Sequence, residues 1–335
     1  MPLPEAIADR GPAPVAATPA GAAVLGLGTA LPERVVANAE VSAALGVDER
    51  WIVKRTGILE RRWAEPGARL HELAAIAGAA ALADADVPAT DVDLVLVATC
   101  TADRLIPNTA PLVAETLGTG GAGAIDVGAA CTGFVSGLGL AVAALESGRA
   151  RRVLLIGAEI LSRHTDPEDR KVAALFGDGA GATVLGTAET SHVGPVVLGS
   201  DGALGEIIFA ERGDGFIRMD GPEVFRHAVD RMGAVAREAC ERAGTTLGEV
   251  DLLVFHQANA RILQALTERL DLDPERVVAA IGCHGNTSAA SIPLALDQVR
   301  RDGRLLDGAS VLVAAFGAGL TWGATVVQWG AGDAS

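Results

Sequence analysis

Two parts of this 335-residue chain repeat each other at a nearly constant offset, and this repeat constrains the fold more than any other feature of the sequence. The segment Asp91–Val95 matches Glu249–Leu253, which lies 158 positions later, and Val153–Leu155 matches Val311–Val313 at the same offset. Short apolar strings recur freely in strands, so coincidence is the alternative explanation. Ordered matches at one offset nevertheless favour an internal duplication.

Strand-like apolar segments alternate with longer helix-like runs, which predicts a layered α/β fold with mainly parallel sheets. We expect strands at Ala23–Thr29, Val92–Ala98, Arg152–Ala158, Val250–His256, Ser310–Phe316 and Gly323–Gln328. We expect helices at His71–Asp84, Thr132–Ser147, Phe225–Arg242 and Ala289–Arg301. The repeat divides the chain into a flexible Pro- and Ala-rich tail (residues 1–21), an N-terminal half (22–190) and a C-terminal half (191–335).

Composition excludes several classes of function. The formal net charge of −15 disfavours binding to a nucleic-acid backbone. No apolar run approaches the ~20 residues that span a bilayer, and the first residues lack the pattern of a signal peptide, so we expect a cytoplasmic protein. The four cysteines are far apart and form no C-x-x-C pair, so neither a metal site nor a disulfide framework is expected.

Cys131 is the strongest candidate for a reactive group. It lies in Asp126–Phe134, between a strand-like run and the N-terminus of the helix expected at Thr132–Ser147. The positive end of a helix dipole favours a thiolate, and the small neighbouring residues leave room for a substrate carbonyl. The alternative is an inert thiol buried as a small apolar side chain.

His256 and Asn286 are the two polar candidates in the second half. His256 directly follows an apolar strand, at the sheet edge where α/β sites gather; a histidine satisfied by backbone groups is the alternative. Asn286 precedes a helix, where it could cap the helix or donate a hydrogen bond to a substrate oxygen. The repeat aligns Cys131 with Asn286 at an offset of 155, so two halves related by a pseudo-dyad would bring both to one cleft.

Two glycine-rich segments complete the set of local motifs. Phe316–Gly323 links two strand-like runs and could supply a backbone N–H to an oxyanion hole. We interpret Phe176–Ala182 as a structural turn. Neither segment has the pattern of a nucleotide-binding loop, so no nucleotide cofactor is predicted.

Five segments together resemble one family, the β-ketoacyl-acyl-carrier-protein synthases III. Four of them, Asp126–Phe134, His256–Arg261, Gly285–Ser291 and Phe316–Gly323, are similar in order and spacing to its signatures. Glu49–Ile58 resembles its N-terminal signature, and the likeness extends from about Ala22 to Trp329. Any one of these motifs is modest, whereas five in register are highly specific.

The resemblance implies a homodimer with the thiolase fold, in which two duplicated α/β halves form five αβαβα layers. It implies that Cys131 takes an acyl group from acyl-CoA, and that His256 and Asn286 then stabilise the enolate formed when malonyl carrier protein loses CO2. The N–H groups of Cys131 and Ala318 would hold the acyl oxygen. No cofactor or metal is implied beyond the substrates acyl-CoA and malonyl carrier protein.

The resemblance also implies binding residues. Trp51 would stack on the adenine of CoA, with Arg55 and Arg170 near its phosphates, and Gly221 and Asn259 would contact the pantetheine arm.

Three further residues, Arg226, Gln257 and Arg261, would dock the acidic carrier protein. Glu268 stands where the family pattern leads us to expect a lysine on that surface. Ile106 takes the place of a bulkier aromatic residue that closes the primer pocket in acetyl-selective members, so branched or longer primers are a hypothesis.

Three alternatives remain. The first is a family member of secondary metabolism that primes a polyketide or only transfers an acyl group; such transferases often lose the donors that His256 and Asn286 provide, so condensation is favoured. The second is a non-catalytic partner subunit, which needs no nucleophile. The third is a thiol redox enzyme, although no second cysteine lies close to Cys131 in sequence.

Overall fold

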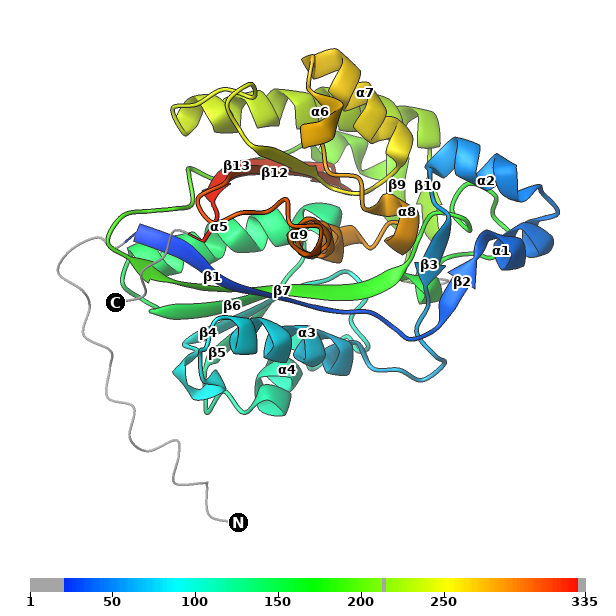
Figure 1. Ribbon diagram of the computed structural model, residues 1–335. Helices are drawn as coiled ribbons and strands as arrows, with labels where there is room; N and C mark the ends of the chain where they lie inside the picture. Colours follow the sequence, from blue (N-terminus) through cyan, green and yellow to red (C-terminus); the bar gives the residue numbers. More distant parts are fainter. Residues whose placement is uncertain (1–20, 213–214, 331–335) are drawn as a thin grey trace, which may run out of the picture.

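The computed structural model describes residues 21–212 and 215–330, and two β-sheets alternate there with three layers of helices (Figure 1). The outer helices of the first sheet are α3 (Leu70–Asp84) and α4 (Thr109–Leu117). Those of the second sheet are α6 (Gly221–Arg242) and α7 (Ala260–Leu270). Helices α5 (Gly133–Glu146) and α9 (Ser291–Arg301) lie between the sheets and contact both. This confirms the predicted five-layer αβαβα arrangement.

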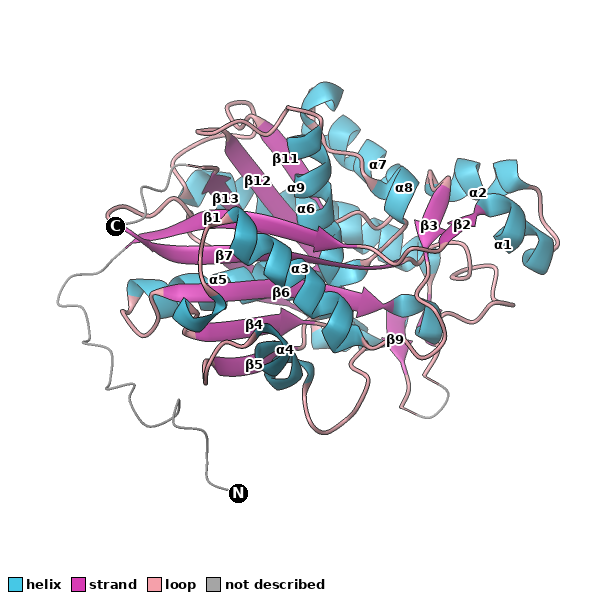
Figure 2. Ribbon diagram, turned by 60° about the horizontal axis from the view of Figure 1, so that its bottom comes forward, coloured by secondary structure: helices cyan, strands magenta, loops and turns pink. Residues whose placement is uncertain are grey.

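The two sheets repeat one strand order, which Figure 2 lets the reader follow along the first sheet. The first sheet is ordered β1-β7-β6-β4-β5 and the second, read in the same sense, β8-β13-β12-β11. The first contains β1 (Gly21–Ala30), β4 (Leu94–Ala98), β5 (Gly123–Val127), β6 (Arg152–Ile160) and β7 (Asp178–Ala188). The second contains β8 (Val197–Ser200), β11 (Leu252–Phe255), β12 (Ser310–Gly317) and β13 (Thr321–Gln328).

The pairing directions repeat as well. In both sheets the first two pairings are antiparallel and the third is parallel. Even β5 has a counterpart, because a parallel bridge from Leu253 to Val277 stands where β5 pairs with β4. The repeated order supports the duplication seen in the sequence. The division at residue 190 falls between β7 and β8, while the exact limits 22–190 and 191–335 stay a prediction.

The remaining elements form a side of the molecule near the end of β1 and the start of β7 (Figure 1). They are β2 (Val35–Ala37), α1 (Asn38–Leu45), α2 (Glu49–Thr56), β3 (Glu60–Arg62), β9 (Ile208–Ala210), β10 (Ile217–Met219) and α8 (Ile281–His284). Within residues 21–212 and 215–330, no helix is both long and apolar enough to cross a membrane, and no group of side chains is placed to hold a metal ion.

Three sequence-based expectations need correction or qualification. Gly21 already belongs to β1, so the predicted tail is one residue too long, and the rest of that tail lies outside the described residues. The glycine-rich segment Phe176–Ala182 is not only a turn, because β7 begins within it at Asp178. Helices α1, α2, α4, α7 and α8 were not predicted.

The central helix layer packs so closely against β6 that one position of this strand, Gly157, has no room for a side chain. Phe134 and Leu138 of α5 and Ile292 of α9 share one buried apolar cluster with strands of both sheets. At Gly157 of β6, a Cβ atom would lie 2.3 Å from the carbonyl oxygen of Ala289, a contact with backbone that no side-chain rotation relieves. The absence of a side chain at Gly157 thus lets the segment before α9 approach the sheet.

We therefore expect the Gly157→Ala substitution to destabilise the protein by about 3 kcal/mol, the upper end for an overpacked core. Chemical denaturation monitored by circular dichroism would measure this change. Gly128→Ala is the matched control, because the same addition there meets nothing within 4 Å. Equal unfolding midpoints for the two variants would contradict the close packing of this layer.

Candidate active site

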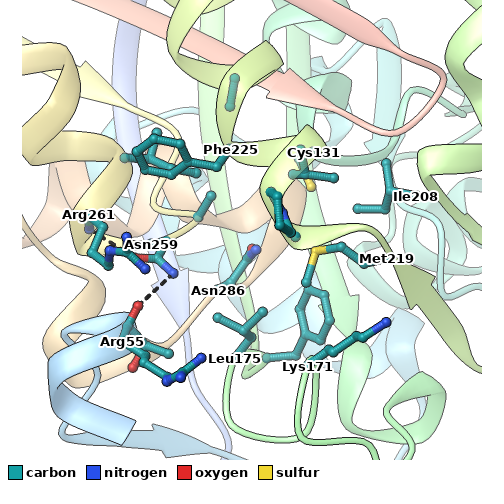
Figure 3. Close-up of a pocket in the computed structure, with 18 of the residues that line it drawn as sticks. Arg55, Cys131, Lys171, Leu175, Ile208, Met219, Phe225, Asn259, Arg261 and Asn286 are labelled. Carbon is teal, nitrogen blue, oxygen red and sulfur yellow. Dashed lines mark hydrogen bonds between the residues drawn. The ribbon is translucent and has the colours of Figure 1, made fainter. Parts of the chain in front are cut away.

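One cavity of about 770 Å³ contains the three residues that the sequence placed in a common site: Cys131, His256 and Asn286 all line it. Cys131 comes from the first half and the other two from the second. Figure 3 shows Cys131 and Asn286 directed into this cavity, with Arg55 and Lys171 on the side away from Cys131 in this view. The predicted convergence of the two halves on one cleft is therefore present in the structure.

Cys131 lies in a short 3-10 turn (Ala130–Thr132) that leads into α5. Ala130, the residue before it, has a φ of 43°, a left-handed conformation that costs energy for a residue with a Cβ atom. On the other side is Gly317, where a Cβ atom would lie 2.9 Å from the backbone nitrogen of Cys131. The strained turn and the missing side chain at Gly317 together hold the thiol at the cavity wall.

Burial opposes the electrostatic effect that the sequence predicted for this thiol. The sequence predicted that the helix N-terminus would favour the thiolate, but burial raises the pKa of Cys131 to about 11 in the substrate-free chain. The Ser288 hydroxyl lowers this pKa by hydrogen bonding and the nearby Glu159 raises it, both by less than burial does. Burial therefore acts against the helix N-terminus and the Ser288 hydroxyl, which both favour the thiolate of Cys131.

His256 is held in one orientation at the end of β11. Its backbone N–H donates to the carbonyl of Ala314 at 2.7 Å, and its Nδ1 lies 2.6 Å from the hydroxyl oxygen of Ser291. Burial lowers the pKa of His256 to about 3, so the imidazole is neutral across the physiological range. A neutral imidazole carries one proton, and its partner at Nδ1 decides which nitrogen holds it.

The hydrogen bonds of Ser291 assign that proton. The hydroxyl oxygen of Ser291 accepts from the backbone N–H of Gln257 at 3.4 Å, which leaves its own hydrogen for Nδ1 of His256. A buried hydroxyl hydrogen needs an acceptor, and Nδ1 is the acceptor within reach. Nε2 of His256 therefore carries the proton as a hydrogen-bond donor, which is the form that stabilises a developing oxyanion.

For the condensation that the sequence resemblance implies, we expect Ser291→Ala to slow the reaction about fivefold, because loss of a neutral hydrogen bond worth about 1 kcal/mol frees the tautomer of His256. Acylation of Cys131 should keep its rate, since that step does not use the Nε2 proton. Separate single-turnover assays of the two steps, with 15N NMR of the imidazole, measure the effect. An unchanged Nε2-protonated signal in the variant would show that Ser291 does not set the tautomer.

Asn286 is oriented by its own backbone and by Ser288. Its N–H donates to the carbonyl of Leu175 at 2.9 Å, and its carbonyl accepts from Gly177 at 3.0 Å, which fixes the loop against the start of β7. The side-chain Oδ1 accepts from the backbone N–H of Ser288 at 2.9 Å. With Oδ1 occupied, the NH2 group is the part of the amide left to donate into the cavity.

The cavity also carries aromatic and basic groups suited to a nucleotide thioester. The guanidinium of Arg55 lies 4.5 Å from the ring centre of Trp51, and both residues line the cavity. Arg170 also lines it, while its guanidinium donates to the carbonyl of Leu45 at 3.0 and 3.2 Å. Lys171, which sequence reasoning missed, adds a further positive charge to this side.

Gly221 and Asn259 line the cavity as well. The side chain of Asn259 caps α7 by accepting from the N–H of Arg261 at 2.9 Å and donates to the carbonyl of Arg55 at 3.1 Å (Figure 3). Asn259 therefore joins the two halves across the cavity wall. A direct contact of either residue with a substrate stays a prediction.

Comparison with known proteins assigns the family. The family model of 3-oxoacyl-[acyl-carrier-protein] synthase III matches residues 125–202, and the model of its C-terminal part matches residues 240–329. A curated β-ketoacyl-[acyl-carrier-protein] synthase III 2 of Streptomyces coelicolor is 48% identical over 92% of this chain and 94% of its own length. The chain belongs to the β-ketoacyl-[acyl-carrier-protein] synthase III family. It is therefore an acyltransferase of the ketosynthase type.

Solved structures of this synthase family agree. The 3-oxoacyl-[acyl-carrier-protein] synthase III of Aquifex aeolicus superposes with a TM-score of 0.89 at 40% identity, covering 92% of this chain and all of that one. The priming β-ketosynthase of the R1128 polyketide pathway has a TM-score of 0.90 at 37% identity and covers 96% of this chain and 98% of that one. The thiolase-like fold predicted from the sequence is thus confirmed.

The synthase surface does not contain all residues predicted to dock a carrier protein. Gln257 is only 2% exposed, and its amide bonds to the backbone of Phe255, Val278, Ala280 and Ile281. The docking role predicted for Gln257 is therefore wrong, because its polar atoms are used to hold the loop that carries His256. Arg261 lines the cavity, whereas Arg226 is exposed and pairs with Glu223 at 2.6 Å.

Ile106 does not lie at the cavity, although its predicted role in the primer pocket requires it to. It is 82% exposed and does not line the cavity that contains Cys131. Within one chain, Ile106 is therefore not a wall of the primer pocket, and the primer hypothesis drawn from its size loses this support. The apolar lining of the cavity comes instead from residues that the sequence did not single out, including Ile208, Met219 and Phe225.

Proposed function

We propose that this synthase joins an acyl group from acyl-CoA to malonyl carrier protein by a decarboxylative condensation that passes through an acyl-Cys131 intermediate. The observation that carries the proposal is the convergence of Cys131, His256 and Asn286 on one cavity that also contains Trp51 and basic side chains. The cavity thus combines a nucleophile with two neutral hydrogen-bond donors and a positive entrance.

The first step is acyl transfer. The Cys131 sulfur attacks the thioester carbon of acyl-CoA, the thiol proton passes to the solvent, and the carbon–sulfur bond to CoA breaks. CoA leaves as a thiolate and takes up a proton from the solvent, so the number of protons is unchanged. We place the acyl oxygen against the N–H groups of Cys131 and Ala318, two residues brought together by the close approach of Gly317 to Cys131. Splitting the condensation into two steps lowers each barrier.

The second step uses the donors from the other half. Nε2–H of His256 and the NH2 group of Asn286 hold the thioester oxygen of malonyl carrier protein, and loss of CO2 places negative charge on that oxygen. The enolate carbon then attacks the acyl-Cys131 carbonyl and releases the Cys131 sulfur. Both donors are neutral, so neither protonates the enolate, and donors fixed before the reaction need no reorganisation.

Substrate binding is proposed from the same cavity. Trp51 offers a flat face for adenine, and Arg55, Arg170 and Lys171 offer positive charge for phosphates. Arg226 and Arg261 remain proposed contacts for the acidic carrier protein. The predicted cytoplasmic location and the predicted lack of a cofactor stay predictions.

We also propose a homodimer. Strand β5 is the edge of its sheet, so no strand among residues 21–212 and 215–330 pairs with its outer side. Ile125 on β5 is 53% exposed, and Leu105 and Ile106 in a neighbouring loop are 70% and 82% exposed. A second copy that paired at β5 would cover this edge, and light scattering of the purified chain tests the proposal by its mass.

A second candidate function is the priming of a polyketide in a secondary-metabolite pathway. The similarity to the R1128 priming ketosynthase over 96% of this chain favours it. The chemistry at Cys131 would be unchanged, and only the primer and carrier protein would differ. Competition between carrier proteins from the two kinds of pathway separates the candidates.

The test of the proposed function is intact-mass spectrometry of the protein mixed with a panel of acyl-CoA thioesters. We expect one added acyl group per chain, located on Cys131 by peptide mapping, and the preferred acyl chain identifies the primer. Formation of no adduct with any member of a panel from acetyl to long and branched chains would contradict the proposal.

A further inference from the structure

A buried carboxyl group is hydrogen-bonded to the loop that carries Asn286 and takes no part in the steps above. Glu159 of β6 has no exposed surface. Its hydrogen-bond partners in the described part of the chain are neutral groups: the hydroxyls of Thr99, Thr101 and Ser288 at 3.1, 2.7 and 3.0 Å, and the N–H and thiol of Cys100 at 3.2 and 3.3 Å. Burial of a carboxyl group among neutral partners is expensive, so its position calls for a reason.

The surroundings of Glu159 are built to donate hydrogen bonds to it. The hydroxyl oxygen of Thr99 accepts from the backbone N–H of Thr101 at 3.0 Å, and the hydroxyl oxygen of Thr101 accepts from the N–H of Ile160 at 2.9 Å. Both hydroxyl hydrogens are therefore free to bond to the carboxyl oxygens of Glu159. Glu159 thus acts as an acceptor that gathers several donors, and one of these donors belongs to the other half of the chain.

The path of β6 brings Glu159 to that other half. Side chains two positions apart in a strand point to the same face, so Glu159 shares a face with Gly157. At Gly157 a Cβ atom would lie 2.3 Å from the carbonyl oxygen of Ala289, the residue that follows Ser288. The missing side chain therefore lets the turn at Ser288–Ala290 reach Glu159, and the Ser288 hydroxyl donates to its Oε1 at 3.0 Å.

Ser288 has a backbone conformation that needs support. Its φ is 48°, a left-handed value that costs energy for a residue with a Cβ atom. The hydrogen bond from its hydroxyl to Glu159 offsets part of this cost. In this conformation the backbone N–H of Ser288 donates to Oδ1 of Asn286 at 2.9 Å.

The side chain of Asn286 depends on that N–H group. The backbone of Asn286 is fixed against Leu175 and Gly177, but these bonds leave the side chain free to rotate. Among the described residues, the N–H of Ser288 is the group that bonds to the side-chain amide of Asn286. A change in the turn at Ser288 would therefore turn the NH2 group of Asn286 away from the cavity.

We propose that Glu159 is a positioning residue for Asn286. It holds the turn at Ser288 in its left-handed conformation, and the N–H of Ser288 then directs the NH2 group of Asn286 toward the malonyl thioester oxygen. Neither Glu159 nor Ser288 lines the cavity, so both act through Asn286. The proposal rests on the proposed function, because it assumes that Asn286 stabilises the enolate.

A Glu159 that only stabilised the fold would behave differently. Loss of its hydrogen bonds would then reduce the amount of folded protein, and acylation and condensation would decline together. A positioning residue for Asn286 affects condensation, whereas formation of acyl-Cys131 does not use the amide. The ratio of the two rates therefore separates the roles.

The first experiment loads the full chain with an acyl group, removes free acyl-CoA, and measures condensation with malonyl carrier protein in a single turnover. It compares the unmodified chain with Glu159→Gln and with the matched control Thr99→Val, which removes one hydrogen bond to the same carboxyl group but keeps the Ser288 link. We expect Glu159→Gln to condense about tenfold more slowly, the lower end for loss of a hydrogen bond to a charged group. We expect Thr99→Val to condense within about threefold of the unmodified rate.

Acylation of the same variants is measured separately by rapid quench and intact mass. Both should acylate within about threefold of the unmodified rate, since neither change touches the donors of that step. An unchanged condensation rate in Glu159→Gln, or an equal loss of acylation and condensation, overturns the proposal.

Two substitutions of Ser288 test the mechanism with Glu159 in place. Ser288→Ala and Ser288→Gly both remove the hydroxyl that bonds to Glu159, and both keep the backbone N–H that bonds to Asn286. Glycine adopts a left-handed φ without steric cost, so the turn in Ser288→Gly no longer needs Glu159. We expect the loaded Ser288→Ala chain to condense about tenfold more slowly and the loaded Ser288→Gly chain to recover to within about threefold of the unmodified rate.

The Ser288 pair decides the proposal even if Glu159→Gln does not fold. Equal rates for Ser288→Ala and Ser288→Gly overturn it, because the hydroxyl would then not act through the conformation of the turn. If the loaded unmodified chain does not condense with malonyl carrier protein, the proposed function itself fails. If the unmodified chain condenses and the Glu159 and Ser288 variants match it, only the role of Glu159 fails.

Discussion

The Cys131→Ala variant should form no acyl adduct and should condense at least about 10⁴-fold more slowly than the unmodified chain, because no other group supplies the covalent intermediate. The reason is geometric as well as chemical. The turn at Ala130–Thr132 and the close approach of Gly317 hold the Cys131 thiol at the cavity. Intact mass after exposure to acyl-CoA, and assay of the ketoacyl product, measure the two effects.

The same variant should still decarboxylate malonyl carrier protein, since His256 and Asn286 remain in the cavity without the nucleophile. Cys283→Ala is the matched control, because Cys283 is an exposed thiol that does not line the cavity. Its adduct and its rate should match those of the unmodified chain. If the adduct formed in Cys131→Ala but not in Cys283→Ala, the nucleophile would be Cys283, and the assignment of the active site to Cys131 would be wrong.

The second large effect is expected at Asn286. Asn286→Asp keeps Oδ1 as the acceptor for the N–H of Ser288, but it replaces the NH2 donor with a negatively charged oxygen. Loss of one oxyanion donor costs roughly 10²- to 10³-fold in rate, and repulsion between the carboxylate and the enolate adds to this. We therefore expect condensation to fall by at least about 10³-fold.

Acylation of Cys131 in Asn286→Asp is the internal control. Because the amide acts on the malonyl oxygen in the second step, the acyl-enzyme should still form and should accumulate when malonyl carrier protein is added. Single-turnover mass spectrometry follows the adduct with time. Loss of acylation and condensation in equal measure would mean that Asn286 acts on the thiol instead.

Much of the fold was readable because the chain repeats itself. Buried strands such as β4 and β11 recur at a fixed offset, and strand order and direction repeat with them. β7 was misread in part, because its glycine-rich start looks like a turn in sequence. In the structure these glycines lie where α9 and its preceding loop press against the sheet, so small residues there reflect packing and not chain reversal.

The site was predictable at its centre but not around it. Cys131, His256 and Asn286 each occur in a distinctive segment that follows an apolar run, which is a signal within the chain. The prediction for Gln257 was wrong because a polar residue next to a catalytic residue was assumed to be exposed. In the structure its side-chain amide forms hydrogen bonds with four backbone groups. Ser291 contacts the ring of His256 from a position distant in sequence, and nothing local marks it.

Chemical competence of the intermediate tests the central claim most directly. The chain is loaded with a 14C-acyl group, freed of acyl-CoA by gel filtration, and mixed with malonyl carrier protein in a single turnover. We predict that the label leaves Cys131 and appears, one equivalent per loaded chain, as ketoacyl carrier protein. Label that stays on the cysteine, or leaves only as the free acid, would contradict an account in which Cys131 hands its acyl group to an enolate held by His256 and Asn286.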